Sequence, residues 1–247
     1  QAMRTRRLYF RDHGAVSTDH AHTDPGTARL PVEDARRLYL QAREGSIAAA
    51  DATALRRHLL ADQARMAADD GLVMTLHPAV HRNHNQEIFE KFGADVGFDI
   101  PLPVDYVRSV QPMLNDVGLD PNFRTVLFTI DETVFSREIA PLAGVYPSVY
   151  AGAPWWFIDA PDAILRYRRA VSETLGYSRT SGFIDDTRAF CSIPARHDMS
   201  RRLDATHLAG LVAEHRIRLE DARELVTTLP DQQPREVFLL GGAEEKN

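Results

Sequence analysis

Short apolar runs alternate along this chain with longer segments in which apolar residues recur every three or four positions. The runs are apolar on both faces, which suits strands covered by other layers, and they span residues 14–19, 72–77, 125–131, 147–152 and 182–186. The periodic segments predict helices over residues 32–43, 52–68, 105–117, 161–175 and 204–214. Alternating strands and helices predict an α/β protein with a parallel sheet, of which β/α barrels are the commonest large example.

The two ends of the chain differ from this pattern. Residues 3–11 read as a helix already in progress, without a capping residue ahead of them. We therefore expect residues 1–240 to be a portion of a larger domain. The small and charged residues of segment 241–247 predict a flexible, solvated tail.

Charge and cysteine content narrow the class of protein. The 247 residues carry a formal charge of −6, and the arginines are scattered among acidic residues, which argues against a nucleic-acid partner. No apolar run approaches the length needed to span a membrane, so we expect no membrane partner. The single cysteine, Cys191, excludes an internal disulfide and is typical of the reducing cytoplasm, and we expect it to be a buried structural thiol.

Polar or aromatic residues follow each predicted strand at its carboxyl end. They are Asp19 and His20, then His77, then Asp131 and Glu132, then Trp155 and Trp156, and finally residues 185–188. Barrel enzymes carry their chemistry at this rim, because the carboxyl ends of parallel strands meet there. The pattern predicts an active site rather than five unrelated polar loops.

Two of these segments combine a proton-transfer group with a cation. Asp186 and Arg188 lie two residues apart, so an extended segment would present both on one side, as a metal ligand or base beside an anion-binding group. A plain ion pair at a strand end is the alternative. His77 and Arg82 suit an anion-binding and proton-transfer wall, whereas a polar surface loop accounts for His81 and His84.

Two further motifs have both a functional and a plain interpretation. His20 and His22 form a His-x-His pair, which opens the metal site of many barrel metalloenzymes but also occurs in polar loops. For Trp155 and Trp156 we expect one ring in the site, against a sugar ring, and one in the packing.

Five motifs in order resemble the uronate isomerase family, also called glucuronate isomerase, of the amidohydrolase superfamily. The motifs are TLHP at 75–78 with Arg82 and Asn83 after it, GFD at 97–99, LFTID at 127–131, GAPWWF at 152–157 and DDTRAF at 185–190. The resemblance extends to about Leu240. It implies a distorted (β/α)8 barrel, of which this chain would be roughly strands four to eight.

The resemblance also implies an activity and its components. The reaction is the interconversion of aldohexuronates and ketohexuronates through an enediol, such as D-glucuronate with D-fructuronate or D-galacturonate with D-tagaturonate. A divalent metal, zinc by expectation, and a cytoplasmic homo-oligomer accompany it. The family's metal-binding His-x-His lies on the first barrel strand, upstream of this chain, so His20 and His22 match a different position.

Carried over by motif, six residues receive expected roles. The catalytic residues would be Asp186, which is also the metal ligand, with Arg188 and His77, and the substrate-binding residues would be Arg82, Trp155 and Asp19. Two rival functions stay open: a metal-dependent hydrolase of the same superfamily, and a non-catalytic half-barrel that depends on a partner.

Overall fold

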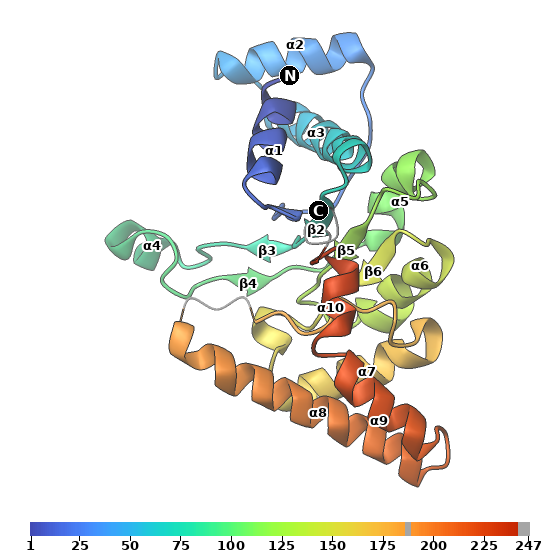
Figure 1. Cartoon of the computed structure of the whole chain (residues 1–247). Coiled ribbons are helices and arrows are strands. Elements are labelled where there is room, and N and C mark those ends of the chain that lie inside the picture. Colours follow the sequence, from blue (N-terminus) through green and yellow to red (C-terminus); the bar gives the residue numbers. More distant parts are fainter. Residues whose placement is uncertain (186–188, 242–247) are drawn as a thin grey trace.

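Four parallel strands form the central sheet of the computed structural model, which describes residues 1–185 and 189–241 (Figure 1). The strands lie in chain order, β1 (Ser17–His20), β2 (Val73–Leu76), β5 (Thr125–Leu127) and β6 (Val149–Ala151). Their register places Asp19 opposite Thr75 and Thr125 opposite Val149. The predicted α/β class with a parallel sheet is confirmed, and all polar strand ends that are described lie at the same edge.

Helices connect successive strands, as the alternating pattern predicts. The α-helices are α1 (Ala2–Asp12), α2 (Val32–Arg43), α3 (Ala49–Asp70), α4 (Gln86–Phe92), α5 (Tyr106–Val117), α6 (Ala140–Val145), α7 (Pro161–Leu175), α8 (Ile193–Ala213), α9 (Leu219–Thr228) and α10 (Gln232–Val237). A π-helical turn spans Phe135–Ile139, and 3-10 turns span Trp156–Ile158 and Phe190–Ser192.

The predicted helix over 204–214 begins eleven residues earlier, as α8 at Ile193. The buried face of α8 includes Ser200, Asp204 and His207 alongside leucines, so apolar periodicity does not reveal its first half. The expected helices over 32–43 and 161–175 have the observed bounds.

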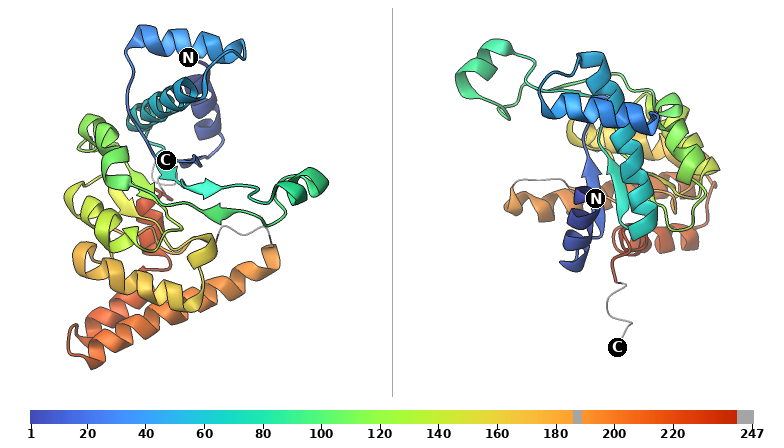
Figure 2. Two further views of the ribbon diagram at one scale, coloured as in Figure 1. Left: turned by 180° about the vertical axis from the view of Figure 1, so that it is seen from behind. Right: turned by 90° about the horizontal axis from the view of Figure 1, so that it is seen from above.

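Side chains alternate between the two faces of the sheet along each strand, and both faces are buried. On one face, Met74, Leu76 and Leu127 pack against α3, α5, α6 and α7. On the other, Val73 and Phe128 belong to a smaller cluster that residues of α10 complete. Figure 2 shows α1, α2 and α3 at one end of the molecule and α7, α8 and α9 at the other.

The prediction of a fifth strand over 182–186 is wrong for residues 182–185, which the structure describes. The parallel pairing occurs earlier, where Thr180 bridges Ala151 and the amide of Ser181 donates to the Ala151 carbonyl at 2.9 Å. Gly182 then takes a left-handed backbone with φ of 75°, which turns the chain out of the ladder, and residues 182–185 form no strand. Asp186 lies outside the described residues.

An arm projects from the sheet between β2 and α5. It consists of a two-residue hairpin, β3 (Val80–His81) with β4 (Ile100–Pro101), and of α4, which Asn85 caps by accepting from the Ile88 amide (Figures 1 and 2). Two residues per strand give too short a pattern to predict a hairpin from sequence.

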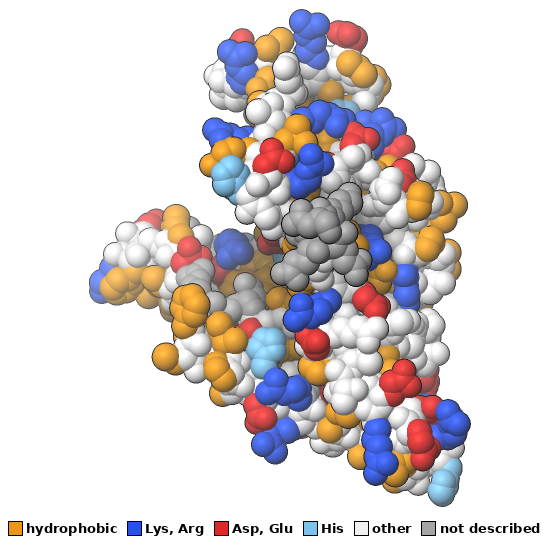
Figure 3. All heavy atoms as spheres, in the orientation of Figure 1, with side chains coloured by type: hydrophobic (Ala, Val, Ile, Leu, Met, Phe, Trp, Pro, Cys, Tyr) orange, Lys and Arg blue, Asp and Glu red, His pale blue; other side chains and the backbone are white. Residues whose placement is uncertain are grey.

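Surface features correct one expectation. Cys191 is exposed rather than buried, because the short 3-10 turn before α8 presents it to solvent. Basic and acidic side chains are interspersed over the face that Figure 3 shows. Within residues 1–185 and 189–241, no helix is both long and apolar enough to cross a membrane.

Candidate functional site

A cavity of about 400 Å³ opens at the carboxyl ends of β1 and β2. Three segments line it: the turn after β1, the segment from His77 into the hairpin, and the residue after β4. The lining residues are Ala21, His22, Thr23, His77, Val80, His81, Arg82 and Leu102. His77 and Arg82, both expected in the site, therefore share one cavity.

His77 is held in place on three sides. Its Nδ1 donates to Oδ1 of Asp19 at 2.5 Å, and the same oxygen accepts from the Thr75 hydroxyl at 2.6 Å. The imidazole stacks on Phe128 with ring centroids 4.1 Å apart, and it meets the edge of Trp155 at 4.6 Å. Since Nδ1 donates to a carboxylate, Nε2 of the neutral ring is the basic nitrogen.

Asp19 stays ionised in this arrangement. Desolvation by itself would raise the pKa of Asp19, but hydrogen bonds from His77 and Thr75 and the charge of His77 lower it below its ordinary value of 3.8. An ionised carboxylate on Nδ1 fixes the imidazole tautomer and stabilises the ring when Nε2 takes a proton. Asp19 thus supports His77 and is not itself among the residues that line the cavity.

Arg82 is oriented by an acidic partner and an aromatic ring. Its Nη1 donates to Oδ2 of Asp99 at 3.2 Å, while Oδ1 of Asp99 accepts from the Asn83 amide at 2.7 Å. The guanidinium carbon lies 5.6 Å from the ring centroid of Trp156, within range of a cation–π contact. A planar cation held this way suits a carboxylate or a sugar oxygen.

Three non-glycine residues beside the cavity have left-handed backbone. They are Ala79, Asn83 and Trp156, with φ of 71°, 55° and 51°. Hydrogen bonds hold the first: its amide donates to the His22 carbonyl at 2.9 Å, and its carbonyl accepts from Leu102 at 2.8 Å. Backbone of this kind costs about 1–3 kcal/mol per residue and concentrates at functional sites.

The two histidines of the His-x-His pair stack with ring centroids 6.3 Å apart, but their surroundings differ. His20 lies within hydrogen-bond distance of the Thr18 hydroxyl at 3.1 Å, and burial lowers its pKa to about 4. His22 lines the cavity, and burial followed by the charge of Arg56 lowers its pKa. Among the residues that the structure describes, no group of three or more His, Cys, Asp or Glu side chains is arranged to hold a metal ion.

The remaining expected residues fall into three groups. Trp155 is 9% exposed and packs against the ring of His77, so it supports that side chain without lining the cavity. Asp186 and Arg188 lie outside the described residues. At the third strand end, Asp131 accepts from Thr133 and Glu132 pairs with Arg166, which makes both of them structural.

Sequence reasoning missed three residues at or beside this cavity. The sequence pattern places His81 in a surface loop and gives His22 only a place in the metal pair, although both line the cavity and His22 lies two residues past the end of β1. Asp99 belongs to the GFD motif, and its role follows only from its ion pair with Arg82.

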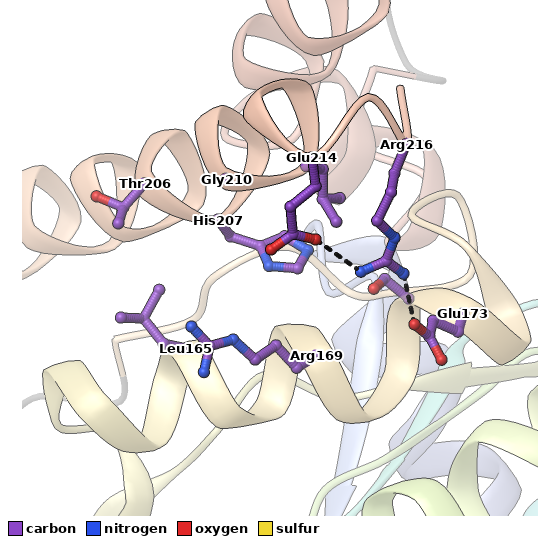
Figure 4. A pocket seen from close by; sticks show the side chains of 10 residues that line it. Leu165, Arg169, Glu173, Thr206, His207, Gly210, Glu214 and Arg216 are labelled. Carbon is purple, nitrogen blue, oxygen red and sulfur yellow. Dashed lines mark hydrogen bonds and ion pairs between the residues drawn. The ribbon is translucent and has the colours of Figure 1, made fainter. Parts of the chain in front are cut away.

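A second pocket, of about 290 Å³, lies between α7 and α8 (Figure 4). Arg216 closes its rim through Glu173 at 2.5 Å and Glu214 at 3.3 Å, so its charge is already balanced. His207, on the α8 side, is hydrogen-bonded to Tyr177 at 3.0 Å. This pocket is remote from the strand ends, and we take the cavity with His77 as the candidate site.

Comparisons with known proteins agree with the motifs. The family described as glucuronate isomerase matches residues 1–238. The uronate isomerase of Cutibacterium acnes is 55% identical over 240 residues, which cover 97% of this chain and 51% of that protein. The chain therefore spans about half the length of the curated relatives it matches.

Solved structures give the same result. The glucuronate isomerase of Caulobacter crescentus aligns with a TM-score of 0.96 and 45% identity, covering 99% of this chain and 51% of that chain. The uronate isomerase of Thermotoga maritima aligns with a TM-score of 0.91 and 26% identity, covering 96% and 52%. This chain belongs to the glucuronate isomerase family.

Proposed function

We propose that this chain is the carboxyl-terminal part of a uronate isomerase, which interconverts aldohexuronates and ketohexuronates such as D-glucuronate and D-fructuronate. The observation that carries the proposal is the cavity in which His77, oriented by Asp19, lies beside Arg82 in a chain of this family. D-galacturonate and D-tagaturonate form a second pair of the same chemistry.

The architecture in this proposal is a (β/α)8 barrel of the amidohydrolase type. Residues 1–240 would supply roughly strands four to eight of one domain, followed by the tail 241–247. Support comes from the sequential strand order, which continues through the pairing of Thr180 with Ala151. A doubly wound sheet would instead reverse its order at a switch point.

Aldose–ketose isomerisation moves a proton between C2 and C1 through an enediol. The step needs a group that takes and returns the proton, and cations that stabilise the developing oxyanion. His77 Nε2 is suited to carry the proton, because Asp19 stabilises the imidazolium that forms. Arg82 would clamp the uronate carboxylate with two parallel N–H groups.

Asp186 and Arg188 complete the proposed site. Asp186 is the second candidate for the proton-transfer group, and Arg188 is its substrate-binding companion. Trp155 would support the wall beside the sugar ring from behind His77.

A divalent metal, zinc by expectation, is proposed only through Asp186. The described residues do not form a metal site by themselves, so no step is assigned to the metal. Tight sites generally use three or more protein ligands.

The proposed location is the cytoplasm, which a single cysteine in 247 residues supports. The proposed assembly is a homo-oligomer, supported by the exposed phenylalanines 89, 92 and 98 of the arm. Light scattering of the complete protein measures the assembly directly.

The test compares the complete protein with a His77→Asn variant, using D-glucuronate in D2O and NMR. We expect ketose formation with deuterium incorporated at C1 of the ketose, and a loss of both in the variant, while His13→Gln, at the exposed C-cap of α1, serves as the matched control. The proposal would be overturned if the protein, supplied with divalent metals, showed no turnover of any hexuronate and no deuterium exchange. Hydrolysis of an amide or ester instead would favour the hydrolase reading.

The 247-residue chain alone gives a second test. We expect it to bind zinc weakly, to associate through the outer edge of β1, and not to isomerise D-glucuronate. Stoichiometric tight zinc with isomerase activity in this chain would contradict the assignment as a carboxyl-terminal part.

A further inference from the structure

Arg196, in the first turn of α8, connects two loops that leave the carboxyl edge of the sheet. Its Nη2 donates to Oδ2 of Asp159 at 2.5 Å, and its Nε donates to Oδ1 of Asp185. The two carboxylates are 26 residues apart in the chain, and each follows a different sheet position. One guanidinium therefore sets the distance between the two loops.

Each of these loops leads to residues of the proposed site. Asp159 ends the 3-10 turn Trp156–Ile158, and its amide donates to the Trp156 carbonyl at 3.1 Å. This turn follows Trp155, whose ring packs against His77. Asp185 directly precedes Asp186 in the sequence.

The helix that carries Arg196 is itself anchored. The next residue, His197, meets Phe183 edge-on with ring centroids 5.0 Å apart. Further along α8, Asp204 forms a buried two-point pair with Arg168 of α7, at 2.5 and 2.9 Å. Arg196 thus ties both loops to a helix that is itself held in place.

The electrostatics make this contact hard to replace. The side chain of Asp185 is 6% exposed, and its Oδ2 is buried without a hydrogen-bond partner among the residues that the structure describes, so Arg196 supplies the counter-charge shown for it there. Removing Arg196 would leave a buried, uncompensated carboxylate, which the loop would relieve by moving toward water. A lysine would keep the charge but cannot donate in one plane to two acceptors.

We propose that Arg196 is a positioning residue of the isomerase reaction, which fixes the loop of residues 153–160 relative to residues 181–185. The inference rests on the proposed function for its catalytic consequence. The cross-link between the two loops does not depend on it.

The experiment compares Arg196→Gln and Arg196→Lys with Arg202→Gln in the complete protein. Arg202 lies on the same helix, is 76% exposed and pairs locally with Asp198, four residues before it, which makes it the matched control. Because small misplacements of catalytic groups cost about 100-fold in rate, we expect Arg196→Gln to lower kcat by about 100-fold per folded molecule, with KM changed by less than about threefold. Arg196→Lys should recover only part of this loss.

Hydrogen exchange read by mass spectrometry supplies a readout independent of activity. Arg196→Gln should speed exchange in residues 153–160 and 181–185 and leave α7 unchanged. Unchanged exchange in both loops would overturn the inference, as would a kcat for Arg196→Gln equal to that of Arg202→Gln. If the parent protein turns over no hexuronate, the proposed function fails, and the exchange measurement still decides whether Arg196 holds the loops.

Discussion

Replacing Gly152 by alanine tests how tightly the base of the site is packed. Gly152 follows β6, and a Cβ added there would lie 2.4, 2.6 and 2.8 Å from three atoms of the Phe128 ring. Carbon atoms in contact normally stay about 3.5–4.0 Å apart, so about 1 Å of space must open. The ring of Phe128 is 2% exposed and has the imidazole of His77 stacked on it at 4.1 Å.

Phe128 has little freedom to retreat from the new methyl group. Its carbonyl accepts a hydrogen bond from the buried Tyr106 hydroxyl, which pins the backbone at this position. Overpacking a core costs about 1–3 kcal/mol, and we expect Gly152→Ala to lower the free energy of unfolding by about 3 kcal/mol. Any ring movement that relieves the clash displaces His77, so kcat should fall as well.

The assay is urea unfolding of the complete protein, followed by tryptophan fluorescence, with kcat measured in parallel. The control is Gly210→Ala in α8, where no atom lies within 4 Å of the new Cβ and the better helix propensity of alanine should stabilise by up to about 1 kcal/mol. The double variant Gly152→Ala/Phe128→Leu should lose less than the sum of the single variants, because the smaller side chain makes room. A Gly152→Ala protein within about 0.5 kcal/mol of the parent would refute this account of the packing.

Three further predictions follow from the charges. The pKa of His20 is about 4 in the folded chain against 6.5 in the unfolded chain, so only the unfolded state gains a proton as the pH falls from 6.5 to 4. The free energy of unfolding should therefore drop by about 3 kcal/mol in this window. Urea titrations in which His20→Gln shows the same drop would contradict this prediction. Arg168→Met should cost about 3–5 kcal/mol in unfolding free energy because it leaves Asp204 buried and unpaired, and Arg168→Met with Asp204→Leu should regain most of it; equal losses in both would contradict the buried-pair argument. Arg82→Lys and Arg188→Lys should each lower kcat/KM for D-glucuronate by about 10- to 100-fold, since a charged hydrogen bond contributes about 1.5–3 kcal/mol, and near-normal steady-state kinetics would remove that arginine from the site.

Local patterns in the sequence are enough to predict several elements of this protein. Residues 32–43 and 161–175 are helices with the predicted bounds, because one apolar stripe at 3.6 spacing both favours the helix and provides its buried face. Four apolar runs became the strands of a parallel sheet, so His77 could be placed at its carboxyl edge. The motifs identified the family, since their order along the chain is a property of sequence alone.

Which side chains meet depends on how the elements pack against one another. Asp19 and His77 are 58 positions apart, and they pair because β1 and β2 align in parallel with Asp19 opposite Thr75. The turn at Gly182 and the early start of α8 at Ile193 depend on contacts with other segments, so no local periodicity reports them. The pairing of Arg82 with Asp99, and that of Arg196 with Asp159 and Asp185, likewise depend on contacts between segments. A period of two or 3.6 residues describes one element, whereas a site is built from the distances between elements, and these are set by packing.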